Sequence, residues 1–224
     1  MKKLVLVLLV IFASTVAAQA PLPPPFPRAN ATKLLENNRI VIWDITWPKG
    51  QPTAMHRHPH DQVGTYYERG GRQITQPDGT TRAAMTEVGS LSTTRKGTTH
   101  IEEGTTDPPL RAVFIELLQD QGPAIPAADT SAVARVAAKP ILDDDRVTVW
   151  DVKWQSGAAG LKYHASRDTV IVWLDSGKLR SVGGKESPAL TDVKAGTMRY
   201  VTHDSAETLE IVEGAPRTMI FQFK

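Results

Sequence analysis

Apolar and polar positions along this chain alternate in short runs, which is the pattern of half-buried β-strands. The clearest runs, rich in β-branched and aromatic residues, are 39–47, 62–68, 111–118, 169–175 and 218–223. Glycine-bearing turns separate them, at Gly70-Gly71, Pro77-Asp78-Gly79 and Gly183-Gly184. Helical periodicity is confined to one short candidate helix at 129–138. Many evenly spaced strands predict an all-β fold, built as a barrel or a double-sheet jelly roll.

The strand pattern occurs twice along the chain. Residues 35–47 align with residues 142–154 at an offset of 107, with Leu, Arg, Trp, Asp and Trp identical. A repeat of this size predicts two tandem copies of a domain. We therefore expect two tandem jelly-roll β-barrels at 33–118 and 140–224, joined by a linker at 119–139. The recurring tryptophans, Trp43 with Trp150 and Trp47 with Trp154, are interpreted as core or interdomain packing.

The first residues have the layout of a secretory signal peptide. Met1-Lys2-Lys3 is cationic, residues 4–12 are apolar without a break, and small residues follow up to Ala20. The apolar run is too short for a stable membrane span; a retained N-terminal anchor is the alternative. A signal peptide at 1–18, cleaved after Ala18 or alternatively after Ala20, predicts a periplasmic or secreted protein with no membrane attachment afterwards. Residues 19–32 then form a Pro-rich, extended leader.

Charge and composition narrow the function classes. The chain has 26 Lys and Arg against 24 Asp and Glu, and removal of Lys2 and Lys3 with the signal peptide brings these numbers into balance. No basic run or stripe is present, so the sequence gives no support for nucleic-acid binding. The absence of cysteine excludes disulfides, thiolate metal sites and a cysteine nucleophile. Any metal ligands must therefore be histidines or oxygen donors.

Four of the six histidines lie in the first copy: His56, His58, His60 and His100. His56 and His58 are two apart on a predicted strand, so both side chains point to one face and can present two imidazoles to one ion. Such a pair alone is weak evidence, because it also arises by chance on protein surfaces. The glycines around the histidines strengthen the evidence for a site. Gly50 stands six residues before His56, and Gly89 and Gly97 precede His100 at fixed distances.

These spacings resemble the cupin superfamily, whose two motifs run G(x)5HxH(x)3–4E(x)6G and G(x)5PxG(x)2H(x)3N. The first motif is matched by Gly50, His56 and His58, with Gln62 at the glutamate place and Gly70 one beyond the final glycine place. The second is matched by Gly89, Gly97 and His100, with Arg95 at the proline place and Gly104 at the asparagine place. The chain thus resembles an exported two-domain cupin, a bicupin of the small cupin-2 type.

The resemblance implies one divalent metal in the N-terminal barrel, bound by His56, His58 and His100 with Gln62 as a possible fourth ligand. Three imidazoles suit Fe, Mn, Ni, Co, Cu or Zn, and the identity stays open. Glutamine in place of glutamate removes a negative charge, so Asp61 is an alternative carboxylate donor. A turn-capping role for Asp61 is equally compatible with the sequence. A metal-free polar pocket is the alternative for the whole set.

Candidate catalytic residues follow from strand alternation. Tyr66 and Glu68 are expected on the same face as Gln62, and Glu102 on the same face as His100, where each could contact a bound molecule or transfer a proton. Tyr66 could equally fill the barrel. Gly64 is expected to leave space above the metal.

The second copy lacks this set. Its aligned residues are Tyr163, Ala165, Thr169 and Glu207, and its histidines, His164 and His203, fall at other positions. We therefore predict a structural role for the C-terminal barrel. Three functions stay open for the whole protein: a metal-dependent enzyme acting on a small molecule with oxygenase, isomerase or lyase chemistry, a non-catalytic metal- or small-molecule-binding module, and a structural scaffold. The expected partner is a small-molecule ligand, and a homodimer is a further option.

Overall fold

The computed structural model describes residues 21–118, 139–155, 161–164, 167–182, 189–203 and 205–224. The predicted signal peptide with its cleavage sites, the candidate helix at 129–138, nearly all of the predicted linker and the turn at Gly183-Gly184 lie outside these residues. Strands occupy most of the described chain, and the described residues include no helix long and apolar enough to cross a membrane.

Two units follow one another along the chain. The strands of the N-terminal unit are β1 (Ala31–Glu36), β2 (Ile40–Trp47), β3 (His56–Arg57), β4 (Asp61–Glu68), β5 (Gly70–Thr75), β6 (Thr81–Thr86), β7 (Leu91–Thr94), β8 (Thr99–Gly104) and β9 (Leu110–Leu117). The strands of the C-terminal unit are β10 (Leu142–Asp143), β11 (Val147–Lys153), β12 (Leu161–His164), β13 (Thr169–Trp173), β14 (Gly177–Val182), β15 (Ala189–Val193), β16 (Met198–Val201), β17 (Ala206–Glu213) and β18 (Arg217–Phe223).

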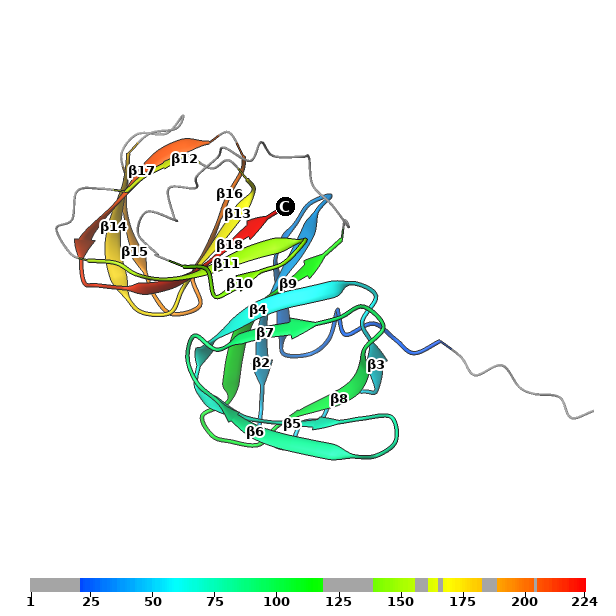
Figure 1. Ribbon diagram of the computed structural model, residues 1–224. Helices are drawn as coiled ribbons and strands as arrows, with labels where there is room; N and C mark the ends of the chain where they lie inside the picture. The colour runs from blue at the N-terminus through cyan, green and yellow to red at the C-terminus, as the bar shows by residue number, and fades with distance from the viewer. Residues whose placement is uncertain (1–20, 119–138, 156–160, 165–166, 183–188, 204) are drawn as a thin grey trace, which may run out of the picture.

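Each unit consists of two antiparallel sheets that face each other. In the N-terminal unit their orders are β1-β2-β9-β4-β7 and β3-β8-β5-β6; in the C-terminal unit they are β10-β11-β18-β13-β16 and β12-β17-β14-β15. The second pair of orders is the first with every strand number raised by nine. Figure 1 shows the two resulting barrels side by side. The predicted all-β fold of two tandem jelly-roll barrels is confirmed.

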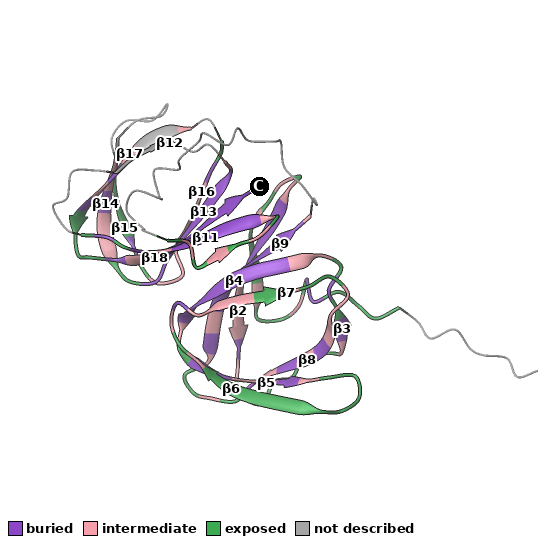
Figure 2. Ribbon diagram, in the orientation of Figure 1, coloured by how far each residue is buried: buried purple, intermediate pink, exposed green. Residues whose placement is uncertain are grey.

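Strand alternation divides the large sheet of the N-terminal unit between two cores. In β2, Trp43 and Trp47 face the interior of their own barrel, whereas Ile40 and Ile42 pack with apolar residues of the C-terminal unit, such as Phe221. Trp150 and Trp154 belong to the interior cluster of the C-terminal barrel. The four recurring tryptophans are therefore barrel-core residues, and Figure 2 shows the buried strands that meet between the units.

Two reciprocal ion pairs join the units. Arg39 of the N-terminal unit donates a hydrogen bond to Asp168 at 2.8 Å, and Arg146 of the C-terminal unit donates one to Asp61 at 3.0 Å. Each arginine also donates to a backbone carbonyl at the end of the other unit's last strand. Asp61 accepts a second bond from the Lys96 backbone N–H at 2.7 Å, so its carboxylate both caps a loop and holds the interface.

Part of the predicted leader is packed against the N-terminal barrel. The ring of Phe26 stacks on Trp43 with the ring centroids 4.6 Å apart, and Phe26 is buried. The carbonyl of Pro23 accepts a hydrogen bond from the Arg57 N–H at 2.9 Å. The described residues 21–30 form neither helix nor strand, as their proline content predicts, and they pack against the N-terminal barrel through these contacts.

Candidate metal centre

Three histidines converge inside the N-terminal barrel. His56 on β3 lies directly opposite His100 on β8, and His58 follows β3 on the same face as His56. All three side chains are buried, and their ring centroids are 4.8 to 5.2 Å apart. One ring nitrogen of each lies within 4.8 Å of the others. We call these three residues the histidine trio.

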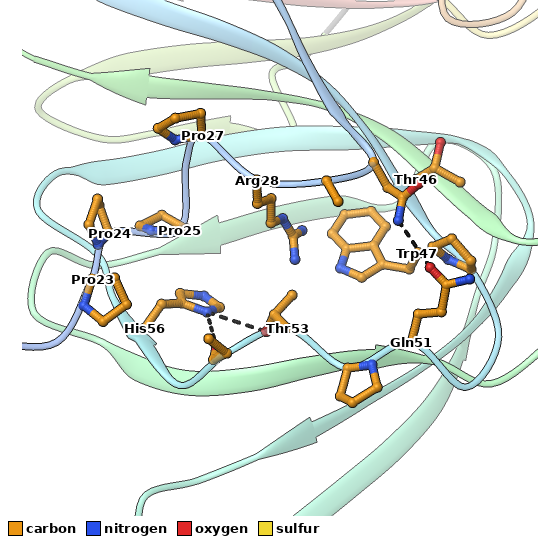
Figure 3. A pocket seen from close by; sticks show the side chains of 15 residues that line it. Pro23, Pro24, Pro25, Pro27, Arg28, Thr46, Trp47, Gln51, Thr53 and His56 are labelled. Carbon is orange, nitrogen blue, oxygen red and sulfur yellow. Dashed lines mark hydrogen bonds between the residues drawn. The ribbon is translucent and has the colours of Figure 1, made fainter.

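The hydrogen bonds of the trio leave ring nitrogens without partners. His56 Nδ1 lies 3.0 Å from the Ala54 carbonyl oxygen, which only an N–H can satisfy, so the lone pair of this ring is on Nε2 (Figure 3). His56 Nε2 is buried and unpaired, as is His58 Nδ1. The Nε2 atoms of His58 and His100 are 3.2 Å apart. Buried polar atoms normally have partners, and a cation among these nitrogens would supply one.

Burial also keeps the trio neutral. Loss of hydration lowers the pKa of all three imidazoles, to about 4 for His58 and His100. At pH 7 each ring therefore has a lone pair available for a metal ion, because a metal-binding imidazole must be deprotonated. The donor set fits a divalent transition metal.

Gln62 lies in the interior of the same barrel. Its side chain is buried, and the amide nitrogen has no hydrogen-bond partner. Alternation along β4 places it on the face of Tyr66, which packs in the barrel core. A role of Gln62 as fourth ligand stays a prediction. Asp61 is engaged by Arg146 and Lys96, so the structure assigns this carboxylate to the interface between the units.

A charged cluster lies beside the trio. The Glu102 carboxylate accepts hydrogen bonds from Arg72 at 2.5 Å, from Arg28 at 3.1 Å and from Trp47 Nε1 at 3.1 Å, and it lies 3.9 Å from His100 Nε2. We call Arg28, Arg72 and Glu102 the arginine–glutamate cluster. Burial alone would raise the pKa of Glu102, but the charges of Arg72 and Arg28 outweigh this effect and lower the pKa to about 2. Glu102 is therefore an ionised partner of the two arginines at neutral pH, and this environment disfavours a role in general acid–base catalysis.

Tyr66 and Glu68, the two candidate catalytic residues on β4, lie in different environments. Tyr66 is buried in the barrel, and its hydroxyl accepts a hydrogen bond from Arg72 at 2.7 Å. Glu68 does not share this face, because the register of β4 shifts between Tyr66 and Glu68. Glu68 forms an ion pair with Arg111 at 3.6 Å instead, and 41% of its side chain is exposed. The expectation that Glu68 faces the site is wrong for this reason.

Gly64 does not leave space above the trio. A Cβ atom at this position would lie 2.0 Å from the ring of Phe114 and 2.6 Å from the Val113 carbonyl oxygen. The glycine thus permits close packing of β4 on β9.

A pocket of about 330 Å³ opens beside His56, between the leader and the chain that links β2 to β3. Figure 3 shows Arg28 pointing into it between His56 and the ring of Trp47. The guanidinium carbons of Arg28 and Arg72 lie 5.7 and 5.0 Å from the Trp47 ring centroid. The sequence alone did not single out either arginine. A signal existed for Arg72 and Glu102, since the residues aligned with them at the offset of 107 are Leu179 and Leu209.

The C-terminal unit has the same backbone register with other residues in it. Tyr163 pairs with Glu207 where His56 pairs with His100. His203 donates its backbone N–H to Asp168, and its ring lies 2.9 Å from the same carboxylate at the interface. Within the described part of the chain, the histidine trio is the one group of three or more potential metal ligands close enough to share an ion.

No family model and no curated protein matches this sequence. Solved structures do match its fold. A cupin 2 conserved barrel domain protein from Leptotrichia buccalis is 13% identical with a TM-score of 0.57, over 87% of this chain and 88% of that one. A salicylate 1,2-dioxygenase from Pseudoaminobacter salicylatoxidans is 12% identical with a TM-score of 0.57, over 83% and 72%. An oxalate decarboxylase from Bacillus subtilis, with Mn(II) centres, is 11% identical with a TM-score of 0.52, over 93% and 78%.

Fold and site together define a double-barrel protein with a three-histidine centre in one barrel. The chain has the cupin fold, in two tandem copies, as the motifs predict.

Proposed function

We propose that this protein is an exported bicupin that binds one divalent transition metal through the histidine trio and acts there on a small molecule. The observation that carries the proposal is the convergence of three buried, neutral imidazoles, two of them with an unpaired ring nitrogen. A metal held this way would supply Lewis-acid or redox chemistry. His56, His58 and His100 would hold it, and the pocket beside His56 would admit the small molecule.

The reaction class is proposed from the solved structures with the same fold. These include a dioxygenase and a decarboxylase, and the decarboxylase has Mn(II) centres. Oxygenase, lyase or isomerase chemistry at a single Fe, Mn, Co, Ni, Cu or Zn ion is therefore the first candidate. The contacts of Glu102 support a second candidate, a non-catalytic binding module, because this carboxylate is engaged by Arg28, Arg72 and Trp47 and is a poor proton acceptor there. Turnover of a substrate separates the two.

Metal analysis of purified mature protein tests the proposal. We expect about one metal ion per wild-type chain and a large loss of metal in His58→Ala and in His100→Ala, because each removes one of three imidazole ligands. His203→Ala is the matched control, since this histidine lies at the interface between the units. Wild-type protein without metal, or equal metal loss in all three variants, would contradict the proposal.

Export is proposed from the N-terminal sequence. Expression of the full chain in a Gram-negative host should yield a periplasmic or secreted product whose N-terminus is Gln19, or Pro21 for the alternative cleavage site. Intact-mass measurement of the purified protein gives the N-terminus directly. Full-length protein in the membrane fraction would instead indicate a retained anchor.

A further inference from the structure

The arginine–glutamate cluster is not required by the barrel itself. In the C-terminal unit the positions of Arg72 and Glu102 are occupied by Leu179 and Leu209, and the strand register is the same in both units. Both leucines are buried in an apolar core. Replacement of buried ion pairs by apolar residues is commonly neutral or stabilising. Three charged side chains in the interior of one barrel, beside the histidine trio, therefore point to a ligand.

The charges of the cluster do not cancel. Glu102 is the single carboxylate, and it already accepts hydrogen bonds from Arg28, Arg72 and Trp47. One positive charge is left in excess. Arg72 also donates to Tyr66, whereas the Nε of Arg28 is buried without a hydrogen-bond partner. A guanidinium has five N–H donors, so Arg28 has the larger unused capacity to bind an anion.

The pocket presents this arginine to an incoming molecule. Arg28 and His56 both line it, and among the described lining residues Arg28 is the one that carries a full charge at neutral pH. Most of the remaining wall is apolar, with prolines from the leader and from the chain after β2, and with Trp47. Proline has no N–H to donate. The pocket thus combines one cation near the trio with walls that suit an apolar body (Figure 3).

We propose that this pocket binds a small organic carboxylate, with its carboxylate group on Arg28 and its apolar body between the proline walls and Trp47. This inference extends the proposed function. It rests on that function for one point, which is that the bound carboxylate is the substrate of the metal site. Glu102 and Arg72 act as positioning residues, because they hold the Arg28 guanidinium beside His56. The leader is then part of the binding site, since it supplies both Arg28 and part of the wall.

Binding of matched probes tests the assignment. Benzoate and succinate are titrated calorimetrically into metal-loaded mature protein, with benzamide and succinamide as uncharged analogues of the same shape. We expect a carboxylate to bind more tightly than its amide by about tenfold or more, because charge-assisted hydrogen bonds to arginine are stronger than neutral ones. Arg28→Met should abolish this difference. Arg28→Lys should keep part of it, because lysine retains the charge without the planar fork.

Controls separate this inference from the metal proposal. Arg69→Met removes an exposed arginine that pairs with Glu87 and should leave carboxylate binding unchanged. Thermal unfolding checks that Arg28→Met is folded, which we expect because Glu102 keeps Arg72 and Trp47. If the wild-type protein takes up no metal and still binds a carboxylate in a way that depends on Arg28, the metal proposal is overturned and the anion site is supported. Equal binding of acid and amide, wild-type affinity in Arg28→Met, or no carboxylate binding up to about 10 mM would overturn the anion site.

Discussion

The contrast between the two barrel interiors gives a quantitative prediction for stability. Glu102→Leu removes the one carboxylate that compensates Arg72, whose side chain is only 15% exposed. Breaking a buried ion pair by removing one partner costs about 3–5 kcal/mol, because a buried charge is left uncompensated. We expect Glu102→Leu to lower the free energy of unfolding by this amount. Arg72→Leu should cost about 2–3 kcal/mol, since Glu102 retains Arg28 and Trp47 as donors.

The double variant Arg72→Leu/Glu102→Leu reproduces the pair found at Leu179 and Leu209 in the C-terminal unit. It leaves one charged group, Arg28, without its partner, and this residue lines the pocket. Each buried leucine contributes about 2 kcal/mol of hydrophobic transfer. We therefore expect the double variant to be more stable than the sum of the single effects predicts, by about 2 kcal/mol or more.

Urea denaturation of the mature protein, followed by circular dichroism, measures these values. A chelator is included, because a bound metal would add its own stabilisation. The two single variants and the double variant together form a double-mutant cycle. The same cycle on the exposed pair Arg69 and Glu87, with 59% and 66% of their side chains exposed, should give a coupling free energy of less than about 1 kcal/mol. If the Arg72 and Glu102 effects add without coupling, the argument that the fold does not require these charges is wrong.

Three further outcomes are expected. Arg39→Met should cost about 2 kcal/mol of unfolding free energy, since Asp168 loses a partner at 2.8 Å while retaining the His203 N–H; a cost under about 0.5 kcal/mol would argue against a structural interface. Burial would raise the pKa of Asp168, but hydrogen bonds from His203 and Arg39 lower it. The stabilising contribution of the Asp168 carboxylate should therefore be complete above the ordinary Asp pKa and disappear as the pH falls through the lowered pKa. When the free energy of unfolding is measured from pH 7 downwards, that of the wild type should fall more steeply than that of Asp168→Asn. Gly104→Ala should destabilise by about 2 kcal/mol or more in thermal unfolding, because its Cβ would lie 2.1 Å from the Trp47 carbonyl oxygen, and wild-type stability would show that the backbone yields there.

The sequence predicts those features that depend on local pattern. Alternation and turn residues identify the strands, and the offset of 107 predicts two tandem barrels, which the structure shows with equivalent strand orders. The histidine trio is predictable from the sequence for the same reason, because His56 and His58 are neighbours on one strand face and the glycine spacing relates them to His100. Each of these signals survives in the fold, since strand geometry fixes which side chains share a face.

Features that depend on a local irregularity or on distant segments are not predictable in this way. The register shift in β4 turns Glu68 outwards, and a strict period of two cannot anticipate a bulge. Arg28 lies in a proline-rich segment with no strand pattern, and it meets Glu102 only because the leader folds back over the barrel. Asp61 resembles a metal ligand in the sequence, whereas its partner Arg146 comes from the other unit.

The reciprocal pairs of Arg39 with Asp168 and of Arg146 with Asp61 have a consequence for how the two halves can differ. Each half contributes an arginine and an aspartate at equivalent positions, and the arginine of one half contacts the aspartate of the other. This is the isologous geometry of a twofold-symmetric dimer. In a homodimer, every substitution would appear in both barrels at once. One polypeptide carrying both halves keeps the symmetric contact and still allows one interior to be charged and the other apolar. The covalent connection thus permits a division of labour that identical subunits could not have.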